Sequence, residues 1–299
     1  MKRLRWALAI GLAMLVGSLV WHASRHVSPG AAAGTRVSGE VNGVKGDSPI
    51  FADTKMGTVP GRQATIRVGT FNIHGGKGRD GRRDLGRVAA GLRDFDFVAL
   101  NEVLGPTLFE GLDQAEQLGR ELGVQWLFAP ADQRWCSGPS GNALLTRLPV
   151  AFWQRLPLPR QFDRSFRNML LLGLECPTKD GNRCTVRLLL THVNRRYDAE
   201  REAQLGAVIA LYLSLAEPAI LLGDLNSDAD DPQMRRLLQT PGVVDVVGEN
   251  LGASDVPGRI DWIIARGLRC ASAGTRDDGT SDHPLVWAVL ELPAATGRL

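Results

Sequence analysis

Short apolar runs that each end in an amide, acidic or imidazole side chain recur along this chain of 299 residues. One run ends in Asn72, another in Glu102 and a third in His192. Apolar runs of this length are typical of buried β-strands, where an acid is costly unless it is paired or holds a metal. The pattern therefore predicts a protein built on sheets, with polar side chains gathered at strand ends.

Later segments repeat the pattern. A fourth run ends in Asp224 and Asn226, which alternate with an apolar residue and would point to one face of an extended strand. Asp261 lies inside an apolar strand, and Asp282 and His283 open the last one. Each of these residues alone would be explained as a strand cap or turn residue, so the hypothesis of a shared site depends on the whole set.

The periodicity of the remaining chain predicts alternating strands and helices. We expect strands at 66–72, 96–103, 126–128, 143–146, 150–156, 169–175, 185–191, 219–222, 259–265 and 284–290. We expect helices at 84–94, 114–122 and 198–215. Helices toward both ends of the sequence, with consecutive strands between them, favour two packed sheets with helices outside, a layered α/β sandwich.

The first 26 residues have the pattern of an export signal, a basic flank followed by an uncharged run at 6–21. The run is shorter than the roughly 20 residues of a membrane span. Cleavage and retention as a membrane anchor both remain open, and either places the rest of the chain outside the cytoplasm, in the periplasm or beyond. We expect residues 1–26 to be the signal or anchor, 27–62 a flexible linker rich in Gly, Ala, Ser and Pro, 63–293 the folded domain and 294–299 a tail.

Composition excludes several classes of protein. With 44% hydrophobic and 22% charged residues, the chain is neither wholly disordered nor a multi-spanning membrane protein. The net charge of +3 is uneven, because residues 1–60 hold seven Lys and Arg but three Asp and Glu. The folded part is therefore close to neutral, which excludes a protein held on nucleic acid mainly by its overall charge.

The four cysteines form no Cys-x-x-Cys pair, so a zinc ribbon is unsupported. Export permits disulfides, and a turn signal between Cys176 and Cys184 favours a bridge across a hairpin. Cys136 and Cys270 would then form the remaining pair. Unpaired buried thiols are an equal alternative.

Seven motifs occur in an order that resembles the endonuclease/exonuclease/phosphatase superfamily, whose members have the DNase I-like fold. They are Thr-Phe-Asn72-Ile-His-Gly-Gly, Val-Ala-Leu-Asn-Glu102-Val, Gly-Asn-Ala-Leu-Leu-Thr-Arg-Leu-Pro, Thr-His192, Gly-Asp224-Leu-Asn226-Ser, Arg-Ile-Asp261-Trp-Ile and Ser-Asp282-His283-Pro. The resemblance covers roughly residues 64–291. It implies a four-layer α/β/β/α sandwich of two mixed sheets flanked by helices, and a metal-dependent phosphoric ester hydrolase.

The resemblance also implies a metal site. Glu102 would be the main ligand, with Asn72 beside it and Asp282 contributing. Hard oxygen ligands suit Mg²⁺, for which Mn²⁺ can substitute. Zinc prefers nitrogen and sulfur over the neutral oxygens of amides. A zinc site is nevertheless the alternative that the histidines offer, from His74, His192 and His283.

The catalytic roles follow from the same resemblance. His283 would be the general base, oriented by Asp261. Asp224 would orient or help to deprotonate the attacking water, and Asn226 would hold a phosphoryl oxygen. His192 resembles the histidine that binds phosphate or protonates the leaving oxygen. The reaction would be in-line attack of water on a phosphoester.

Arginine suits phosphate because it can bond two oxygens at once. We expect Arg164, Arg167 and Asn168, which precede a strand, and Arg195, which follows His192, to bind the substrate. An equal alternative is that these side chains are only charged groups exposed to solvent, with no role in binding. Weaker candidates are Arg196, Arg79, Arg82 and Arg83.

The sequence predicts a secreted or membrane-anchored, monomeric, Mg²⁺-dependent phosphodiesterase, with nucleic acid as the leading substrate. Alternatives are a phosphoinositide phosphatase or a phospholipid phosphodiesterase of the sphingomyelinase kind, for which Phe162 and Phe166 would form an exposed apolar loop. A non-catalytic binding module on the same fold would show eroded motifs, and the main motifs are intact.

Overall fold

The computed structural model describes residues 65–106, 111–134, 138–160, 166–178, 182–252 and 257–293. The predicted export segment, linker and tail lie outside this part of the chain, as do Cys136, Phe162 and Arg164. Among the described helices, none is long and apolar enough to cross a membrane.

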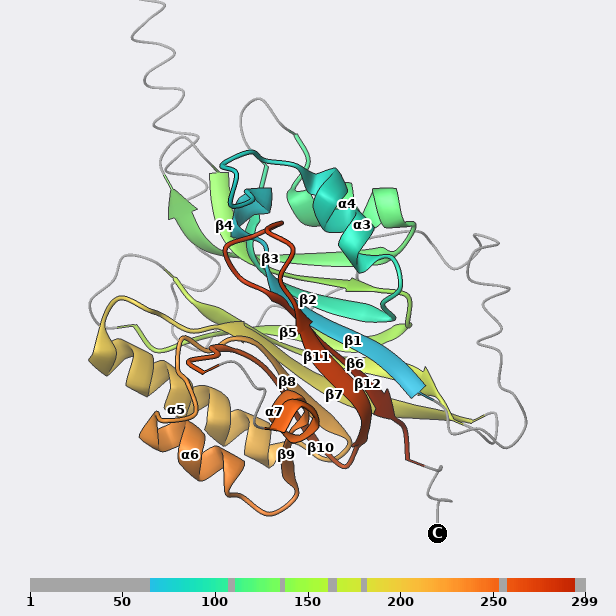
Figure 1. Ribbon diagram of the computed structural model, residues 1–299, viewed down its shortest axis with the longest axis vertical. Coiled ribbons are helices and arrows are strands. Elements are labelled where there is room, and N and C mark those ends of the chain that lie inside the picture. Colours follow the sequence, from blue (N-terminus) through green and yellow to red (C-terminus); the bar gives the residue numbers. More distant parts are fainter. Residues whose placement is uncertain are drawn as a thin grey trace, which may run out of the picture.

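In the part of the chain that the structure describes, twelve strands form two mixed sheets of six strands each (Figure 1). The first sheet has the order β11-β12-β1-β2-β4-β3, in which β1 and β2 are parallel and the other neighbours are antiparallel. Its strands are β1 (Thr65–Asn72), β2 (Phe97–Leu104), β3 (Gln125–Arg134), β4 (Gly138–Thr146), β11 (Arg269–Arg276) and β12 (Leu285–Glu291).

The second sheet has the order β5-β6-β7-β8-β10-β9, in which only β7 and β8 are parallel. Its strands are β5 (Val150–Pro157), β6 (Asn168–Pro177), β7 (Arg183–His192), β8 (Ala219–Asp224), β9 (Val243–Asp245) and β10 (Asp261–Arg266).

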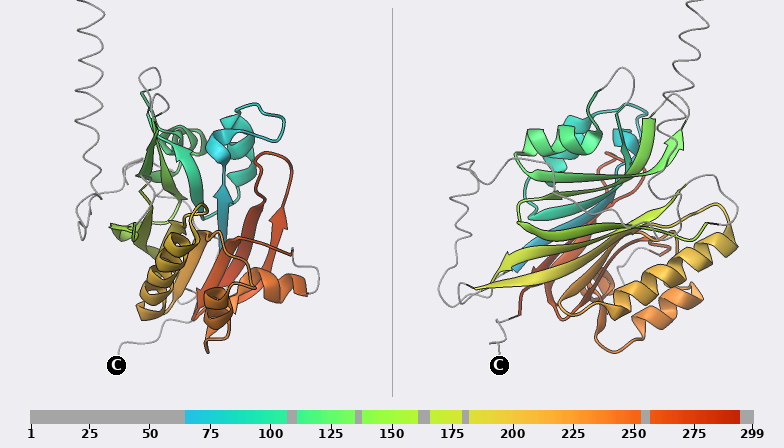
Figure 2. Two further views of the ribbon diagram at one scale, coloured as in Figure 1. Left: turned by 90° about the vertical axis from the view of Figure 1, so that its left-hand side faces the viewer. Right: turned by 180° about the vertical axis from the view of Figure 1, so that it is seen from behind.

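Helices cover the outer face of each sheet, as Figure 2 shows from two sides. The short helices α3 (Leu85–Leu92) and α4 (Gln114–Leu122) pack on the first sheet, whereas α5 (Asp198–Ser214) and α6 (Pro232–Leu238) pack on the second. Helix α7 (Val246–Leu251) lies at the edge of the core between the sheets, and a 3-10 turn, η1 (His74–Gly76), follows β1. The predicted four-layer sandwich is confirmed.

The leucine run of β7 shows why the central strands are apolar throughout. Leu188 and Leu190 face the core between the two sheets, while Leu189 packs with Leu205 and Val208 of α5. Successive strand residues point to opposite faces, so a strand covered on both sides needs an apolar residue at every position. All three leucines are fully buried.

Several elements were not predicted. They are η1, α6, β9, α7 and β11, and β3 and β4 are longer than expected. Strand β11 lies at the edge of its sheet and consists largely of small and polar residues, so it carries no apolar run. Helix α6 has seven residues and begins at Pro232, with the side chain of Asp231 accepting hydrogen bonds from its first turn.

The predicted hairpin disulfide does not form. Cys176 and Cys184 lie directly opposite each other on β6 and β7, as the turn signal predicted, but both are free thiols, and so is Cys270. The alternative of unpaired thiols therefore holds for the three described cysteines.

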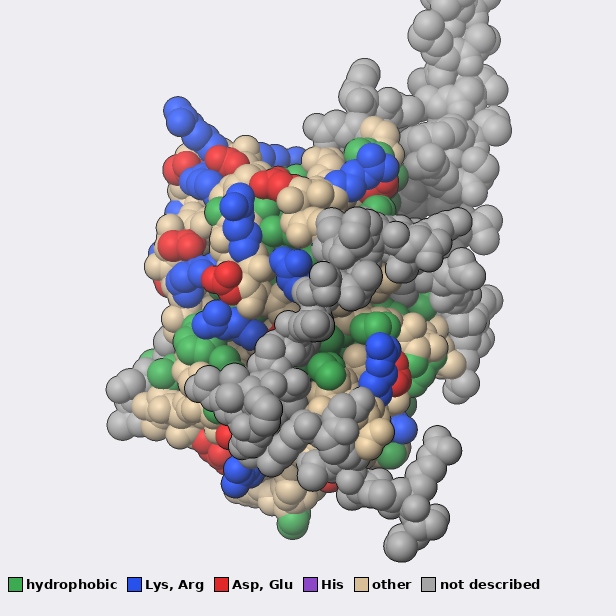
Figure 3. All heavy atoms as spheres, turned by 90° about the vertical axis from the view of Figure 1, so that its right-hand side faces the viewer, with side chains coloured by type: hydrophobic (Ala, Val, Ile, Leu, Met, Phe, Trp, Pro, Cys, Tyr) green, Lys and Arg blue, Asp and Glu red, His purple; other side chains and the backbone are tan. Residues whose placement is uncertain are grey.

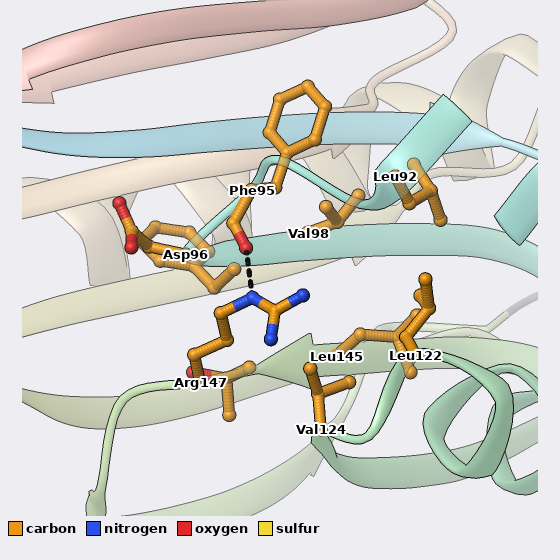
Figure 4. A pocket seen from close by; sticks show the side chains of 10 residues that line it. Leu92, Phe95, Asp96, Val98, Leu122, Val124, Leu145 and Arg147 are labelled. Carbon is orange, nitrogen blue, oxygen red and sulfur yellow. Dashed lines mark hydrogen bonds between the residues drawn. The ribbon is translucent and has the colours of Figure 1, made fainter. Parts of the chain in front are cut away.

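A small, mainly apolar cavity lies between α3, the end of α4, β2 and β4 (Figure 4). Arg147 closes it: Nε donates to the carbonyl of Phe95 at 3.2 Å and Nη2 to that of Arg93 at 3.0 Å. These bonds satisfy carbonyl groups at and beyond the end of α3. The cavity lies near the start of β2, away from the polar strand ends.

Asn101, in β2, ties the two sheets together. Its Nδ2 donates to Asn142 Oδ1 of the same sheet at 2.8 Å and to the carbonyl of Thr191 in β7 at 3.1 Å. Its Oδ1 accepts from the backbone N–H of Asp224 in β8 at 3.0 Å. Gly223 permits this close approach of chains, because a Cβ there would collide with the Thr191 carbonyl.

Replacing Asn101 by alanine should destabilise the protein by about 2–3 kcal/mol, because the buried partners on both sheets would lose their bonds. Urea unfolding of the full chain measures the change. The control is Gln117→Ala, which removes a bond at the protein surface and should change stability by less than about 0.5 kcal/mol. Equal effects of the two substitutions would show that Asn101 does not join the sheets.

Candidate active site

Polar side chains from both sheets meet where β1, β7 and β8 end and β10 begins. Asp224 ends β8, and its register partners are His192 in β7 and Asp261 in β10. Asn72, at the end of β1, and His283, just before β12, come from the first sheet. The first four of these residues are buried, and the side chain of His283 is 17% exposed. The predicted convergence of strand ends thus occurs.

Asp224 is the most enclosed acid of this group. Its Oδ2 accepts a hydrogen bond from Asn72 Nδ2 at 3.2 Å, and its Oδ1 accepts one from the backbone N–H of Asn226 at 2.9 Å. Oδ2 also lies 3.5 Å from Nε2 of His192 and 3.9 Å from Nε2 of His283. Burial, reinforced by the charge of Asp261, raises the pKa of Asp224 to about 7.

His283 and Asp261 form a dyad across the two sheets. Nδ1 of His283 lies 2.7 Å from Asp261 Oδ2, which assigns the proton of this bond to Nδ1 and turns Nε2 toward Asp224. Burial opposes the charge on the imidazole, but the hydrogen bond to Asp261 and the surrounding carboxylates outweigh it and raise the pKa of His283 to about 9. Ser281 Oγ donates to the carbonyl of Asn72 at 2.7 Å and so fixes the loop that carries His283.

A buried arginine supports the dyad from the far side. Arg259 Nη1 donates to the carbonyl of Asp261 at 3.3 Å, and Nη2 pairs with Asp245 at 2.6 Å. The guanidinium lies over the ring of Trp262, 4.1 Å from its centre. Trp262 in turn donates from Nε1 to the carbonyl of Ser227, in the turn that follows β8.

Glu102 lies at an irregularity in β2. The register between β2 and β4 shifts between Leu100 and Val103, and Glu102 has a φ of +54°, which is rare for a residue with a side chain. Asn101 pairs in register with Asn72, so Glu102 lies one residue beyond the end of β1. Its half-buried carboxylate makes no hydrogen bond or ion pair with any described residue.

His74 lies beside Asp282 at the rim of the site. Its Nδ1 is 3.3 Å from Asp282 Oδ1, and the two side chains are 42% and 54% exposed. His74 begins η1 with a φ of +49° and donates from its backbone N–H to Asn72 Oδ1 at 3.1 Å. It reaches the site edge through this turn.

The oxygen-rich donor set fits a hard divalent cation. Glu102 offers a carboxylate with no partner among the described residues, and Asp282 offers a second one, 54% exposed, beside His74. Asp224, Asp261 and His283 also cluster, with one potential ligand atom of each within 4.8 Å of the others, and within the described ranges no other such cluster of acids, histidines or cysteines occurs. The zinc alternative is not supported, because this cluster contains His283 but neither His74 nor His192.

The predicted substrate-binding residues do not form one cluster in the structure. Arg195 is exposed after β7, and Arg164 lies outside the described residues. Arg167 Nη1 lies 3.0 Å from His192 Nδ1, at the side of the site. Asn168 is 4% exposed and lies beneath the site, where it donates to the carbonyl of Pro130 and accepts from Asn142. Its polar groups are thus occupied by the protein.

Asn226 is near the site for a different reason from the one expected. Strand β8 ends at Asp224, and Asn226 lies in the following turn with a φ of +48°. Its Nδ2 donates to the carbonyl of Val193 at 2.9 Å. The turn, rather than strand alternation, brings it beside Asp224.

Sequence reasoning assigned no role to Asn101, Asn142, Ser281 or Arg259, which hold the site in place. All four occur within or beside the motifs, so their positions were visible but their partners were not. For Asn101 a signal existed, because an amide inside a fully apolar strand needs a buried partner.

The model of the endonuclease/exonuclease/phosphatase family matches residues 69–283. Solved structures agree in fold. An endonuclease/exonuclease/phosphatase from Beutenbergia cavernae DSM 12333 is 23% identical with a TM-score of 0.63, covering 78% of this chain and 73% of that one. The catalytic domain of human Nocturnin with bound sulfate is 19% identical, with a TM-score of 0.59 and coverage of 78% and 96%.

A mannosyl-6-phosphatase from Bacteroides thetaiotaomicron VPI-5482 is 18% identical, with a TM-score of 0.58 and coverage of 75% and 99%. None of the curated proteins matches the chain. The likenesses to solved structures establish the fold, and the family model covers most of the folded chain, including each of the polar strand ends. The chain therefore belongs to the endonuclease/exonuclease/phosphatase family of metal-dependent phosphoric ester hydrolases.

Proposed function

We propose that this chain is a Mg²⁺-dependent phosphodiesterase that hydrolyses nucleic acid by in-line attack of water. The observation that carries this proposal is the dyad of His283 and Asp261, whose free Nε2 faces the buried carboxylate of Asp224 at 3.9 Å. A histidine oriented by a carboxylate and aimed at a second carboxylate suits the removal of a proton from a water molecule held between them.

In the proposed reaction, Nε2 of His283 takes the proton from the attacking water while Asp261 stabilises the imidazolium. Asp224 orients the water. Asn226 uses one N–H of its amide for the carbonyl of Val193, which leaves the second N–H for a phosphoryl oxygen. Uptake of the proton requires a neutral His283, so its raised pKa favours turnover at alkaline pH.

Glu102 and Asp282 would hold the cation, with Asn72 beside them. A divalent cation, when bound, offsets the negative charge that develops on the phosphoryl oxygens. The absence of partners for Glu102 among the described residues supports this role, and so does its positive φ, because rare backbone conformations cluster at functional sites.

Two exposed basic segments that follow site residues support a nucleic acid substrate. Arg195 and Arg196 come directly after the β7 strand that ends in His192, and Lys77, Arg82 and Arg83 follow η1. No ion pair with a described acid neutralises these five side chains. Figure 3 shows basic and acidic side chains interspersed over one face of the molecule. Local rather than overall charge would bind the phosphate backbone.

The lipid alternative has less support. Phe166 is half-buried beneath Arg160, whose guanidinium lies 4.4 Å from the centre of its ring, so this residue offers no exposed apolar contact. Export through residues 1–26, and anchoring if that segment is retained, stay part of the proposal and follow from the basic flank and apolar run alone.

The full chain should nick supercoiled plasmid in Mg²⁺ and lose this activity in EDTA. His283→Ala should lower the nicking rate by at least about 100-fold, because the general base is lost. Agarose gels measure the rates, and Gln117→Ala is the control for handling and fold. If the wild type fails to nick DNA, the nuclease proposal is wrong, and assays with sphingomyelin, phosphoinositides and mannose 6-phosphate then identify the phosphoester class.

Without metal, the protein should become less stable as pH rises. The pKa of Asp224 is raised from 3.8 to about 7 and that of His283 from 6.5 to about 9, so both groups favour the folded state when protonated. The contribution of Asp224 is lost between about pH 4 and 7, and that of His283 between about pH 6.5 and 9. Thermal unfolding in EDTA at a series of pH values measures the loss of stability. The variant His283→Gln should lose less stability above pH 7 than the wild type. An equal loss in both proteins would contradict the raised pKa of His283.

Replacing both Arg195 and Arg196 by alanine should weaken DNA binding without changing kcat. Each lost phosphate contact should reduce the slope of log affinity against log salt by about 1. Fluorescence anisotropy in Ca²⁺ with a labelled duplex measures binding. The matched control is the double alanine variant of Arg235 and Arg236 on α6, which has equal charge loss. Equal effects of the two double variants would argue against a local binding surface.

A further inference from the structure

The imidazole ring of His192 lies between an arginine and a carboxylate. Its Nδ1 is 3.0 Å from Nη1 of Arg167, and its Nε2 is 3.5 Å from Oδ2 of Asp224. The side chain is 5% exposed. Each ring nitrogen therefore has a fixed neighbour of known hydrogen-bonding character.

The arginine determines which nitrogen of the ring carries the proton. A guanidinium has five N–H donors and no acceptor, and it stays charged in proteins. Arg167 can therefore only donate to Nδ1 of His192, which must present its lone pair. The ring proton then lies on Nε2, beside Asp224. A doubly protonated ring would set two donors against each other, so the contact selects the neutral Nε2–H tautomer.

The backbone holds both partners in place. The carbonyl of Arg167 accepts from the N–H of Leu158 at 2.9 Å, and the next residue, Asn168, begins β6. Thr191 Oγ1 donates to the carbonyl of Asn168 at 3.2 Å. Thr191 directly precedes His192, so this bond joins the two segments that carry the pair. The contact is thus built into neighbouring strands.

We propose that Arg167 is a positioning residue that fixes His192 as a neutral Nε2–H donor to a phosphoryl oxygen, rather than as the acid that protonates the leaving oxygen. The inference rests on the phosphodiesterase function proposed above. It chooses between the two roles that the family resemblance left open for His192, and it moves Arg167 from direct substrate binding to orientation of a neighbour.

The proton balance of the reaction follows. The water oxygen forms a bond to phosphorus and loses a proton to Nε2 of His283, while the bond from phosphorus to the leaving oxygen breaks. His192 keeps its ring proton throughout, because loss of that proton from a neutral ring would produce an imidazolate. The leaving oxygen therefore takes its proton from solvent water.

The tautomer can be measured without any substrate. Long-range ¹H–¹⁵N spectra of the full chain labelled in histidine should show Nδ1 of His192 with the shift of an unprotonated nitrogen and Nε2 with that of a protonated one, the signal being assigned by its loss in His192→Gln. Arg167→Lys should preserve this pattern, because an ammonium also only donates. Arg167→Met should not. A protonated Nδ1 in the wild type would overturn the proposal.

The products of the wild-type reaction first identify the leaving oxygen. The role of His192 is then tested with an oligonucleotide in which sulfur replaces that oxygen, because a thiolate leaves without taking up a proton. His192→Ala should lower kcat by about 100-fold to 1,000-fold on the oxygen and sulfur substrates alike. Recovery of wild-type rates on the sulfur substrate alone would show that His192 is a general acid, which contradicts the proposal.

A double-variant cycle tests whether Arg167 acts through His192. Arg167→Met should lower kcat about 10-fold to 100-fold by itself and Arg167→Lys by less, whereas Arg167→Met should add no further loss to His192→Ala. If the reductions in kcat of the two single variants multiply in the double variant, Arg167 acts on the substrate directly. Arg236→Met is the matched control. If the wild type cleaves no oligonucleotide, the phosphodiesterase function fails, while the spectra still decide the tautomer.

Discussion

The buried carboxylate of Asp224 is the charge around which the rest of the site is arranged. It is 1% exposed at the end of a central strand, where an unpaired charge would be very costly. Asn72 and the backbone of Asn226 donate to it, and the imidazoles of His192 and His283 stand beside it. These neighbours come from both sheets. The hydrogen bonds and charge compensation that this buried acid requires therefore constrain how the two sheets pack on each other.

The centre of the fold could be predicted from the sequence because its strands are buried on both faces. The leucines of β7 and β8 form continuous apolar runs, and the amphipathic period of α5 is long enough to recognise. The edges could not be predicted in the same way. Strand β11 is stabilised by pairing along a single edge and by half-buried small residues, so its sequence lacks any period that distinguishes it from a loop.

The kinds of residue at the site could also be predicted, and the family resemblance implied the pairing of His283 with Asp261, but other pairings could not be predicted. The positions of Asp261 and His283 at strand ends indicate that they approach Asp224, because buried polar groups require hydrogen-bond or charge partners. The contact between Arg167 and His192 depends instead on how β6 begins beside the end of β7, and the place of Asn226 depends on a turn with positive φ. Periodicity gives the face on which a side chain lies, but it does not give the neighbour that it meets there.

The division of the dyad between the sheets has a consequence for folding. His283 is carried by the chain that enters β12, whereas Asp261 begins β10 of the opposite sheet. Neither half of the sandwich contains a base together with the acid that orients it. Any opening of the interface between the two sheets would separate His283 from Asp261, so the dyad depends on the packing of the whole sandwich.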